Sequence, residues 1–449
     1  MATDDREVAD MNLVMFAPCP RASAIGRMAH LVVNELCGNG HTVVVVCTES
    51  AESRHGEVRD FGAQAMHWTD SDEVQAAITS ADAVIYQIGD NFHYHEGSLY
   101  WLERQRGIVC LHDFFLGNLF WTWGQSDRKR ASAVLQQWYG DEIARTYFAH
   151  TSSANFIAAT HENAPMTEWI ASQASAVIAH SGWGMGRVLS ACPGPVRLVP
   201  LAYEVVPAVG SRFETPISSV GRMQVLTVGH VNPNKRAECV IRAIGADERL
   251  REGTSYTLAG AIQTDMRRGL EELANALGVD LHVCGEVSDQ ELQRLLAGAD
   301  VVCCLRNPTL EAASASAIEA MLSARPLIVE NAGFFAELPD DCVRKIRPDH
   351  EEADLCKELL DLKANPMTRK SLGMQAQAWA RETFTAKNYA RQLTDLVSLS
   401  QRSMLVSETM QVFARQLAQW AGAESMLTLP DTLGPLRIFD VGAVQDQKA

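Results

Sequence analysis

The sequence has little positive charge for its size and no long apolar run. Among its 449 residues, 39 Lys and Arg stand against 55 Asp and Glu, which gives a net charge of −16. A protein that wraps nucleic acid needs a basic field, so we expect no nucleic-acid partner. No run approaches the ~18–20 apolar residues that cross a bilayer. Residues 1–10 are acidic, unlike a signal peptide. These features predict a cytoplasmic protein that is soluble or peripheral to a membrane.

Paired cysteine motifs are also missing. The chain has 11 cysteines, and none of them stand at CxxC spacing. Most lie in apolar runs, such as Cys47 after four valines and Cys110 in "GIVCLHD". Cysteine in such surroundings behaves as a small buried hydrophobe. The pattern predicts free thiols in a reducing compartment rather than a disulfide framework.

What the sequence does have is a regular alternation of strand and helix patterns. Residues 11–18 and 41–48 are apolar strand patterns, and the amphipathic pattern of residues 25–40 lies between them. The alternation restarts after residues 205–222, which are rich in Pro and Gly and indicate a linker. Repeated β-α units imply parallel sheets with right-handed crossovers. Residues 366–400 and 401–425 then read as separate helices.

The expected fold class is therefore α/β, with two Rossmann-like domains facing each other across a cleft and helices at the C-terminal end. The expected boundaries are 1–208 for the first Rossmann-like domain, 209–385 for the second, and 386–449 for C-terminal helices plus a tail. Ligands of open α/β sheets bind at the carboxyl ends of the strands. Chemistry is therefore expected in the loops that follow the strands.

One such loop holds two glutamates in an apolar setting. In "NPTLEAASASAIEAMLSARPLIV", seven small or apolar residues separate Glu311 from Glu319. Ser314 or Ser316 is suited to cap the helix that follows. The N-terminus of a helix attracts phosphate, and a carboxylate near it can bind ribose hydroxyls. The alternative is that both glutamates are ordinary solvated residues.

A second loop gathers cations. In "VGHVNPNKRAE", His230, Lys235 and Arg236 lie between a strand and a helix. They are candidate donors to a diphosphate. Cations at the start of a helix oppose its dipole, which favours a functional role over ordinary surface charge.

The second half of the chain resembles the family-4 retaining glycosyltransferases of the GT-B fold. The segments that carry the resemblance are "VLTVGHVNPNKR", "GVDLHVCGEVSDQELQRLLAGADVVCCL" and "EAASASAIEAMLSARPLIVENAGFFAEL", in the family order. The first half shares the outline through "GNGHTVVVV", a His-Asp step and "ASAVIAHS". The resemblance implies a nucleotide-diphospho-sugar donor, retention of anomeric configuration, and no metal or other cofactor. It also implies that the first domain is the acceptor domain, that the second is the donor domain, and that the C-terminal helices return toward the first.

The resemblance also implies roles for single residues. Glu311 would bind hydroxyls of the donor sugar near the reacting carbon, and Glu319 would bind the ribose. Lys235, with His230 and Arg236 beside it, would neutralise the diphosphate. Backbone amides at the helix start would support sugar and phosphate, namely those of Ala312, Ala313, Ser314 and Ala315.

Two residues of the first half also acquire roles through the resemblance. Gly26 would let a loop approach the diphosphate, since glycine tolerates close backbone approach. His112 would lie in the cleft near donor and acceptor, although a lone histidine in an apolar strand is more often structural.

Three departures from the family pattern keep other functions open. His230 stands where the family often has Arg, "EAAS" replaces the glycine-rich "EGFG" step, and Arg325 replaces a Gly before the next strand. A catalytically weak partner that binds nucleotide sugars is one alternative. A GT-B phosphorylase or nucleotide-sugar epimerase is another.

The acceptor is expected to be a growing glycan, a glycolipid or a lipid-linked saccharide. Aromatic residues crowd segments 91–101 and 113–124, close to Arg128, Lys129 and Arg130. Such a surface could rest on an anionic leaflet at the inner face of a membrane. The alternative is a core with one solvated charge run. The sequence predicts no oligomeric state. "DSD" at 70–72 is expected to cap a helix rather than bind a metal.

Overall fold

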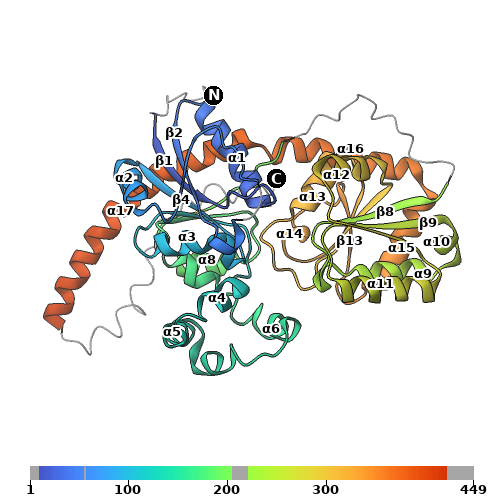
Figure 1. Cartoon of the computed structure of the whole chain (residues 1–449), viewed down its shortest axis with the longest axis horizontal. Helices are drawn as coiled ribbons and strands as arrows, with labels where there is room; N and C mark the ends of the chain where they lie inside the picture. The colour runs from blue at the N-terminus through green and yellow to red at the C-terminus, as the bar shows by residue number, and fades with distance from the viewer. Residues whose placement is uncertain (1–9, 55–56, 205–220, 422–449) are drawn as a thin grey trace. The chain divides into compact units, whose positions relative to one another are not determined.

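The computed structural model describes residues 10–54, 57–204 and 221–421, with the backbone alone for 405–421 (Figure 1). The chain divides into two units. Unit 1 is Met1–Ala202 with Ala386–Ala449, and unit 2 is Tyr203–Thr385. The predicted boundary at 208/209, most of the predicted linker and the predicted tail of 426–449 lie outside the described residues.

Unit 1 is built on a seven-stranded sheet in the order β3-β2-β1-β4-β5-β6-β7. Every pair of neighbouring strands is parallel. The central strands consist mainly of apolar residues, because helices cover both faces of a parallel sheet. The strands are β1 Asn12–Ala17, β2 Thr42–Cys47, β3 Gln64–His67, β4 Ala83–Ile88, β5 Ile108–Leu111, β6 Ala176–Ala179 and β7 Val196–Leu198.

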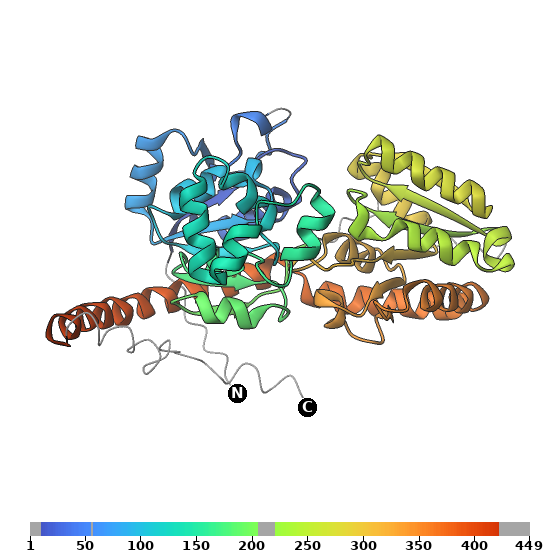
Figure 2. The same ribbon diagram turned by 90° about the horizontal axis from the view of Figure 1, so that it is seen from below.

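The helices of unit 1 connect these strands and then return at the C-terminal end. They are α1 Ala24–Gly38, η1 Ala51–Ser53, α2 Ser71–Ser80, α3 Phe92–Leu102, α4 Gly117–Trp123, α5 Arg128–Thr146, α6 Ser153–Thr160, α7 Thr167–Ala171, α8 Met185–Ala191 and α17 Ala386–Ala421. Helix α17 packs on α1 and β6. It is the long orange-to-red helix in Figures 1 and 2. The prediction of separate helices on either side of residue 400 was wrong. The stretch contains no Gly or Pro to end the first one.

Unit 2 has a six-stranded parallel sheet in the order β10-β9-β8-β11-β12-β13. The strands are β8 Met223–Val228, β9 Thr254–Ala259, β10 Asp280–Gly285, β11 Val301–Cys304, β12 Leu327–Glu330 and β13 Val343–Ile346. The helices are η2 Pro233–Lys235, α9 Ala237–Gly245, α10 Glu248–Gly253, α11 Thr264–Leu277, α12 Asp289–Gly298, α13 Ala315–Leu322, α14 Gly333–Ala336, α15 Glu351–Ala364 and α16 Pro366–Thr383. This strand order is that of a dinucleotide-binding Rossmann sheet, which confirms the predicted class of unit 2.

The strand order of unit 2 determines where a ligand can bind. The sheet grows outward from β8 in both directions, first through β9 and β10 and then through β11 to β13. The connections that follow β8 and β11 therefore leave the sheet on opposite faces, and a crevice opens between them. The two loops at this point are 229–236 and 305–314, and with the start of α13 they contain the donor-site residues predicted for unit 2.

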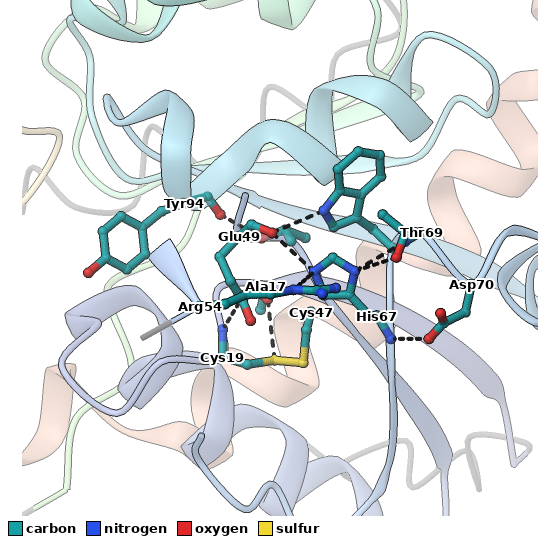
Figure 3. The surroundings of a disulfide bond; sticks show 11 residues. Ala17, Cys19, Cys47, Glu49, Arg54, His67, Thr69, Asp70 and Tyr94 are labelled. Atoms are coloured by element: carbon teal, nitrogen blue, oxygen red, sulfur yellow. Dashed lines mark hydrogen bonds between the residues drawn. A yellow bond between two sulfur atoms is a disulfide. The ribbon is translucent and has the colours of Figure 1, made fainter. Parts of the chain in front are cut away.

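The prediction of free cysteines was wrong for one pair. Cys19 and Cys47 form a disulfide with a Cα–Cα distance of 5.2 Å, and the other nine cysteines are free (Figure 3). The two cysteines are 28 residues apart in sequence. The parallel pairing of β1 with β2 brings them together by placing Ala17 opposite Cys47.

Within the described part of the chain, every helix is too short or too polar to cross a bilayer.

Candidate active site

The first loop of the site places a buried ammonium at the carboxyl end of β8. Lys235 ends the short helix η2, and its side chain folds back so that Nζ donates to the Val228 carbonyl at 3.0 Å. The residue is only 6% exposed. Gly229 makes room for it, because a Cβ at that position would lie 2.6 Å from Nζ. His230 is exposed on the same loop.

The second loop holds Glu311 through an arginine that the sequence analysis did not select. Arg306 follows β11 and is 2% exposed. Its Nε lies 3.2 Å from both carboxylate oxygens of Glu311, and its Nη2 donates to Ser316 Oγ at 3.1 Å. Glu311 keeps 33% of its side chain exposed. The ion pair therefore fixes the carboxylate while leaving part of it open to a ligand. A charged residue directly after the apolar run "VVCCL" was the sequence signal for Arg306.

Helix α13 begins beside this ion pair. Ser314 is its N-cap residue, with an extended backbone, and the first bond of the helix runs from Ile318 N–H to the Ser314 carbonyl at 3.1 Å. The N–H groups of the first turn precede that bond and have no partner within the helix. They make this end of α13 positive and suited to an anion. Ala312 and Ala313, whose small side chains are buried, directly precede the N-cap residue.

Two cations and two anions determine the electrostatics of the site. Burial lowers the pKa of Lys235 to about 8, as does the charge of Arg306, while Glu311 and Glu319 act in the opposite direction. Burial opposes ionisation of Glu311, but the charges of Arg306 and Lys235 outweigh it and lower the pKa of that carboxyl. At neutral pH, Lys235 is therefore mostly protonated and Glu311 is ionised. Glu319 lies on α13, close enough to influence Lys235.

A carboxylate from the start of α15 connects the two loops. Glu351 accepts from Arg236 of the first loop, at 2.8 Å from Nε and 2.5 Å from Nη2. It also accepts from Asn307 Nδ2 of the second loop at 2.5 Å. The guanidinium of Arg236 is thus engaged within unit 2, and its contact with a diphosphate stays a prediction. Sequence analysis missed Glu351 because it lies 115 residues from Arg236.

A second buried carboxyl supports this connection. Glu330, at the end of β12, accepts the Arg306 backbone N–H at 3.0 Å. Burial, followed by contact with Glu351, raises the pKa of Glu330 to about 9. Burial opposes ionisation of Glu351, but hydrogen bonds from Glu330, Arg236 and Asn307 lower its pKa. Glu330 therefore keeps its proton at neutral pH, and Glu351 carries the negative charge.

Replacing Glu330 with glutamine should stabilise the protein increasingly as pH rises. The unfolded chain ionises this carboxyl above about pH 4.5, whereas the folded chain holds the proton until about pH 9. The parent therefore loses stability across that window, by at most about 1.4 kcal/mol per pH unit. Glu330→Gln cannot ionise, so its thermal midpoint should exceed that of the parent at pH 8 and approach it at pH 5.

The control for this measurement is Glu286→Gln, which changes an exposed glutamate of the same unit. Its midpoint should follow that of the parent at every pH. A difference between Glu330→Gln and the parent that is the same at pH 5 and pH 8 would contradict the assigned protonation state.

In unit 1, Gly26 lies at the third position of α1. Its N–H donates to Oγ of Ser23, the N-cap residue, at 3.0 Å. A Cβ there would lie 2.2 Å from the Pro18 carbonyl oxygen, so glycine lets α1 approach the chain leaving β1. This gives the residue a packing role within unit 1. Its contact with a diphosphate stays a prediction.

His112 follows β5 and belongs to a cluster of buried histidines. Its Nε2 lies 2.7 Å from Gln87 Oε1, and its ring centroid is 4.9 Å from that of His180. Burial lowers its pKa well below 6.5, and His180 and His95 lower it further. His112 is therefore neutral at physiological pH, and its Nε2 donates to the amide oxygen of Gln87. Its predicted role near donor and acceptor stays a prediction.

The aromatic zone of unit 1 packs largely within the unit. Phe115 and Phe120 are fully buried. Arg128 stacks on Phe148 at 3.8 Å from the ring centroid, and Arg130 lies 5.1 Å from a ring centroid of Trp123. These contacts favour the alternative of a core with cations on its surface.

The "DSD" prediction concerned the start of α2. Asp70 occupies the N-cap position, as predicted, but its side chain makes no hydrogen bond to the helix; its carboxylate accepts from the His67 N–H at 3.0 Å instead.

Known structures share this architecture over nearly their whole length. The Anabaena protein Alr3699/HepE, solved with UDP and glucose, superposes with a TM-score of 0.59 at 13% identity, over 86% of this chain and 99% of that one. Sucrose-phosphate synthase from Thermosynechococcus elongatus gives a TM-score of 0.61 at 14% identity, over 88% and 99%. Such low identities establish the fold alone. The chain has the GT-B glycosyltransferase fold, as predicted.

The match to a protein family lies within unit 2. Residues 213–379 match the family model described as Glycosyl transferases group 1. The chain therefore carries a glycosyl transferases group 1 domain, and both loops of the candidate site lie within it. A 207-residue stretch is also 28% identical to the MMP alpha-(1->4)-mannosyltransferase of Mycolicibacterium hassiacum, over 44% of this chain. The match spans about half, 47%, of that relative.

Proposed function

We propose that the protein is a retaining glycosyltransferase. It moves a sugar from a nucleotide-diphospho-sugar, a UDP- or GDP-sugar, to a glycan, a glycolipid or a lipid-linked saccharide. The observation that carries this proposal is the pairing of the buried Lys235 ammonium with the start of α13 at neighbouring strand ends, beside Glu311. A departing diphosphate needs such a concentration of positive charge.

The proposed reaction breaks the bond between the anomeric carbon and the diphosphate oxygen. Negative charge grows on the diphosphate, where Lys235 and the first-turn N–H groups of α13 stabilise it. Glu311 holds hydroxyls of the sugar, and Glu319 holds the ribose. The acceptor hydroxyl attacks from the face that the diphosphate leaves and transfers its proton to the departing phosphate. The reaction then needs no pair of carboxyls at hydrolase spacing, and no metal or other cofactor.

Named relatives support the choice of donor. The Anabaena protein was solved with UDP-glucose as well as with UDP, and the similar stretch of the Mycolicibacterium protein belongs to a mannosyltransferase. The first protein was thus solved with a nucleotide-linked hexose, and the name of the second states transfer of a hexose. We therefore propose that this chain is a hexosyltransferase.

One observation favours a second candidate, a protein that binds nucleotide sugars without transferring the sugar. Glu351 engages Arg236, the cation next to Lys235, at short distances. A donor site with one fewer available cation would bind the nucleotide and stabilise the leaving group less. Binding of a nucleotide sugar without transfer to any of a panel of glycan and glycolipid acceptors would select this candidate.

Nucleotide-sugar binding should depend on Glu319. A ligand at 100 times its Kd adds ~2.7 kcal/mol to the free energy of unfolding, so the matching nucleotide sugar should raise the thermal midpoint clearly in a screen of UDP, GDP, ADP and CMP sugars. Glu319→Ala should abolish that shift, because the ribose loses its acceptor. EDTA should leave it unchanged.

The matched control is Glu272→Ala, which removes an exposed glutamate from α11 of the same unit. It should keep the full shift. A full shift in Glu319→Ala as well would exclude Glu319 from the nucleotide site.

A further inference from the structure

Three buried side chains of the kind that bind metals meet at the carboxyl ends of β1 and β2 (Figure 3). They are Cys19, Cys47 and Glu49. One ligand atom of each, the two sulfurs and a carboxylate oxygen, lies within 4.8 Å of the other two. We propose that, once the Cys19–Cys47 disulfide is reduced, these three residues bind one zinc-type divalent cation.

The strand register explains why the three residues lie close together. Ala17 of β1 lies opposite Cys47 of β2. Cys19 follows Ala17 by two residues, and Glu49 follows Cys47 by two. All three residues lie at the paired strand ends or within two residues of them, so the pairing of β1 with β2 brings the segments that carry them together.

The charge of Glu49 favours a cation at this place. The residue is 3% exposed, and its Oε2 accepts the Cys19 N–H at 3.1 Å. Within the described parts of the chain, it has no ion-pair partner within 4 Å. A buried carboxylate is costly unless a positive charge or several donors compensate it. A bound cation would provide that compensation.

The backbone of Glu49 is held in place by its neighbours. Its carbonyl accepts from Trp68 Nε1 at 3.0 Å and lies 3.1 Å from His67 Nε2 (Figure 3). The hydrogen bond from Trp68 thus holds the backbone of the residue whose carboxylate would bind the metal. A site of this kind is preorganised by its supporting contacts.

The ligand set selects the metal. Zinc binds thiolate and carboxylate in tetrahedral sites, at about 2.3 Å to sulfur and about 2.0–2.2 Å to oxygen. Thiolates favour zinc over magnesium and calcium, which take oxygen ligands. Three protein ligands leave the fourth position to water.

Disulfide and metal exclude each other at this site. A thiol reductant gives two electrons and two protons to the Cys19–Cys47 bond and itself becomes a disulfide. Zinc then displaces both protons from the new thiols and binds the thiolates. The end of β1 and the loop before α1 are therefore linked to the end of β2 in both states, by the disulfide in the oxidised protein and by the cation in the metal-bound protein.

The test compares oxidised and reduced protein. The full chain is reduced with excess dithiothreitol, freed of it by anaerobic gel filtration, and titrated with Zn²⁺ or Co²⁺. The reduced parent should retain one zinc per chain more than Cys19→Ser and Cys47→Ser, and its cobalt form should show a thiolate-to-cobalt charge-transfer band. The oxidised parent should show no such band.

Glu49→Gln distinguishes a specific three-ligand zinc site from nonspecific binding of zinc to thiols, because this variant keeps both cysteines. It should bind zinc at least about tenfold more weakly than the parent, since a neutral amide is a poor zinc ligand. Cys37→Ser and Cys284→Ser, which remove exposed cysteines, should keep the full stoichiometry. The proposal is overturned if the reduced parent binds no more zinc than Cys19→Ser, or if Glu49→Gln binds it as tightly as the parent.

Discussion

Lys235→Met should strongly reduce sugar transfer without destabilising the protein. The ammonium is the only charge that this substitution removes, and methionine fills a similar volume. Loss of one preorganised charge at a developing anion typically reduces kcat by about 10²–10³-fold. Because burial lowers the pKa of Lys235 to about 8, the folded chain holds this charge at a cost to stability. The thermal midpoint of the variant should therefore equal or exceed that of the parent.

Kinetics with the donor found in the thermal-shift screen would measure the effect on transfer. Lys357→Met is the matched control, because it removes an exposed lysine from α15 of the same unit. It should keep parental kcat. If Lys235→Met kept parental kcat and donor affinity, the assignment of the leaving group to this loop would be wrong.

The pH dependence of the parent gives an independent test of Lys235. The ammonium is required, so kcat/KM of the free protein should fall as pH rises through about 8, where the residue loses its proton. A bound diphosphate adds negative charge beside the ammonium and raises its pKa. The profile of kcat should therefore stay flat to a higher pH than that of kcat/KM. In Lys235→Met the alkaline fall of kcat/KM should disappear.

Much of the candidate site could be predicted because its signals are local. Lys235, Glu311 and Glu319 each lie within a few residues of a strand end or a helix start, and such positions are visible in the pattern of one segment. The same pattern predicted the parallel sheets. The short strand β3 was missed because it is partly exposed and has no apolar run, and β13 because two of its four residues, Arg344 and Lys345, are charged.

Contacts between distant segments could not be predicted. The Cys19–Cys47 bond depends on the pairing of β1 with β2, and the connection from Arg236 to Glu351 depends on α15 packing against α9. Both contacts are consequences of how the sheets assemble, and the sequence around one partner does not indicate which residue the other partner is. Arg306 is intermediate, because its position was visible but its pairing with Glu311 was not.

Glu311→Gln should separate sugar transfer from nucleotide binding. The substitution keeps the size of the side chain and removes the charge that Arg306 holds in place. The proposed contact with sugar hydroxyls weakens near the reacting carbon, so transfer should fall by about 10²-fold or more. Binding of the free nucleoside diphosphate should stay within about twofold, a difference of less than 0.5 kcal/mol. Initial rates and a thermal titration with nucleoside diphosphate would measure the two effects.

A double-mutant cycle of Arg306→Gln and Glu311→Gln would test the role of Arg306. Arg306 is buried and positions Glu311, so Arg306→Gln should also reduce transfer. If the arginine acts through Glu311, the double variant should lose no more activity than Glu311→Gln alone. Removing one partner of a buried ion pair also destabilises a protein, by about 3–5 kcal/mol, so both single variants should unfold earlier than the parent. Additive losses of activity would instead mean that Arg306 acts on the substrate directly.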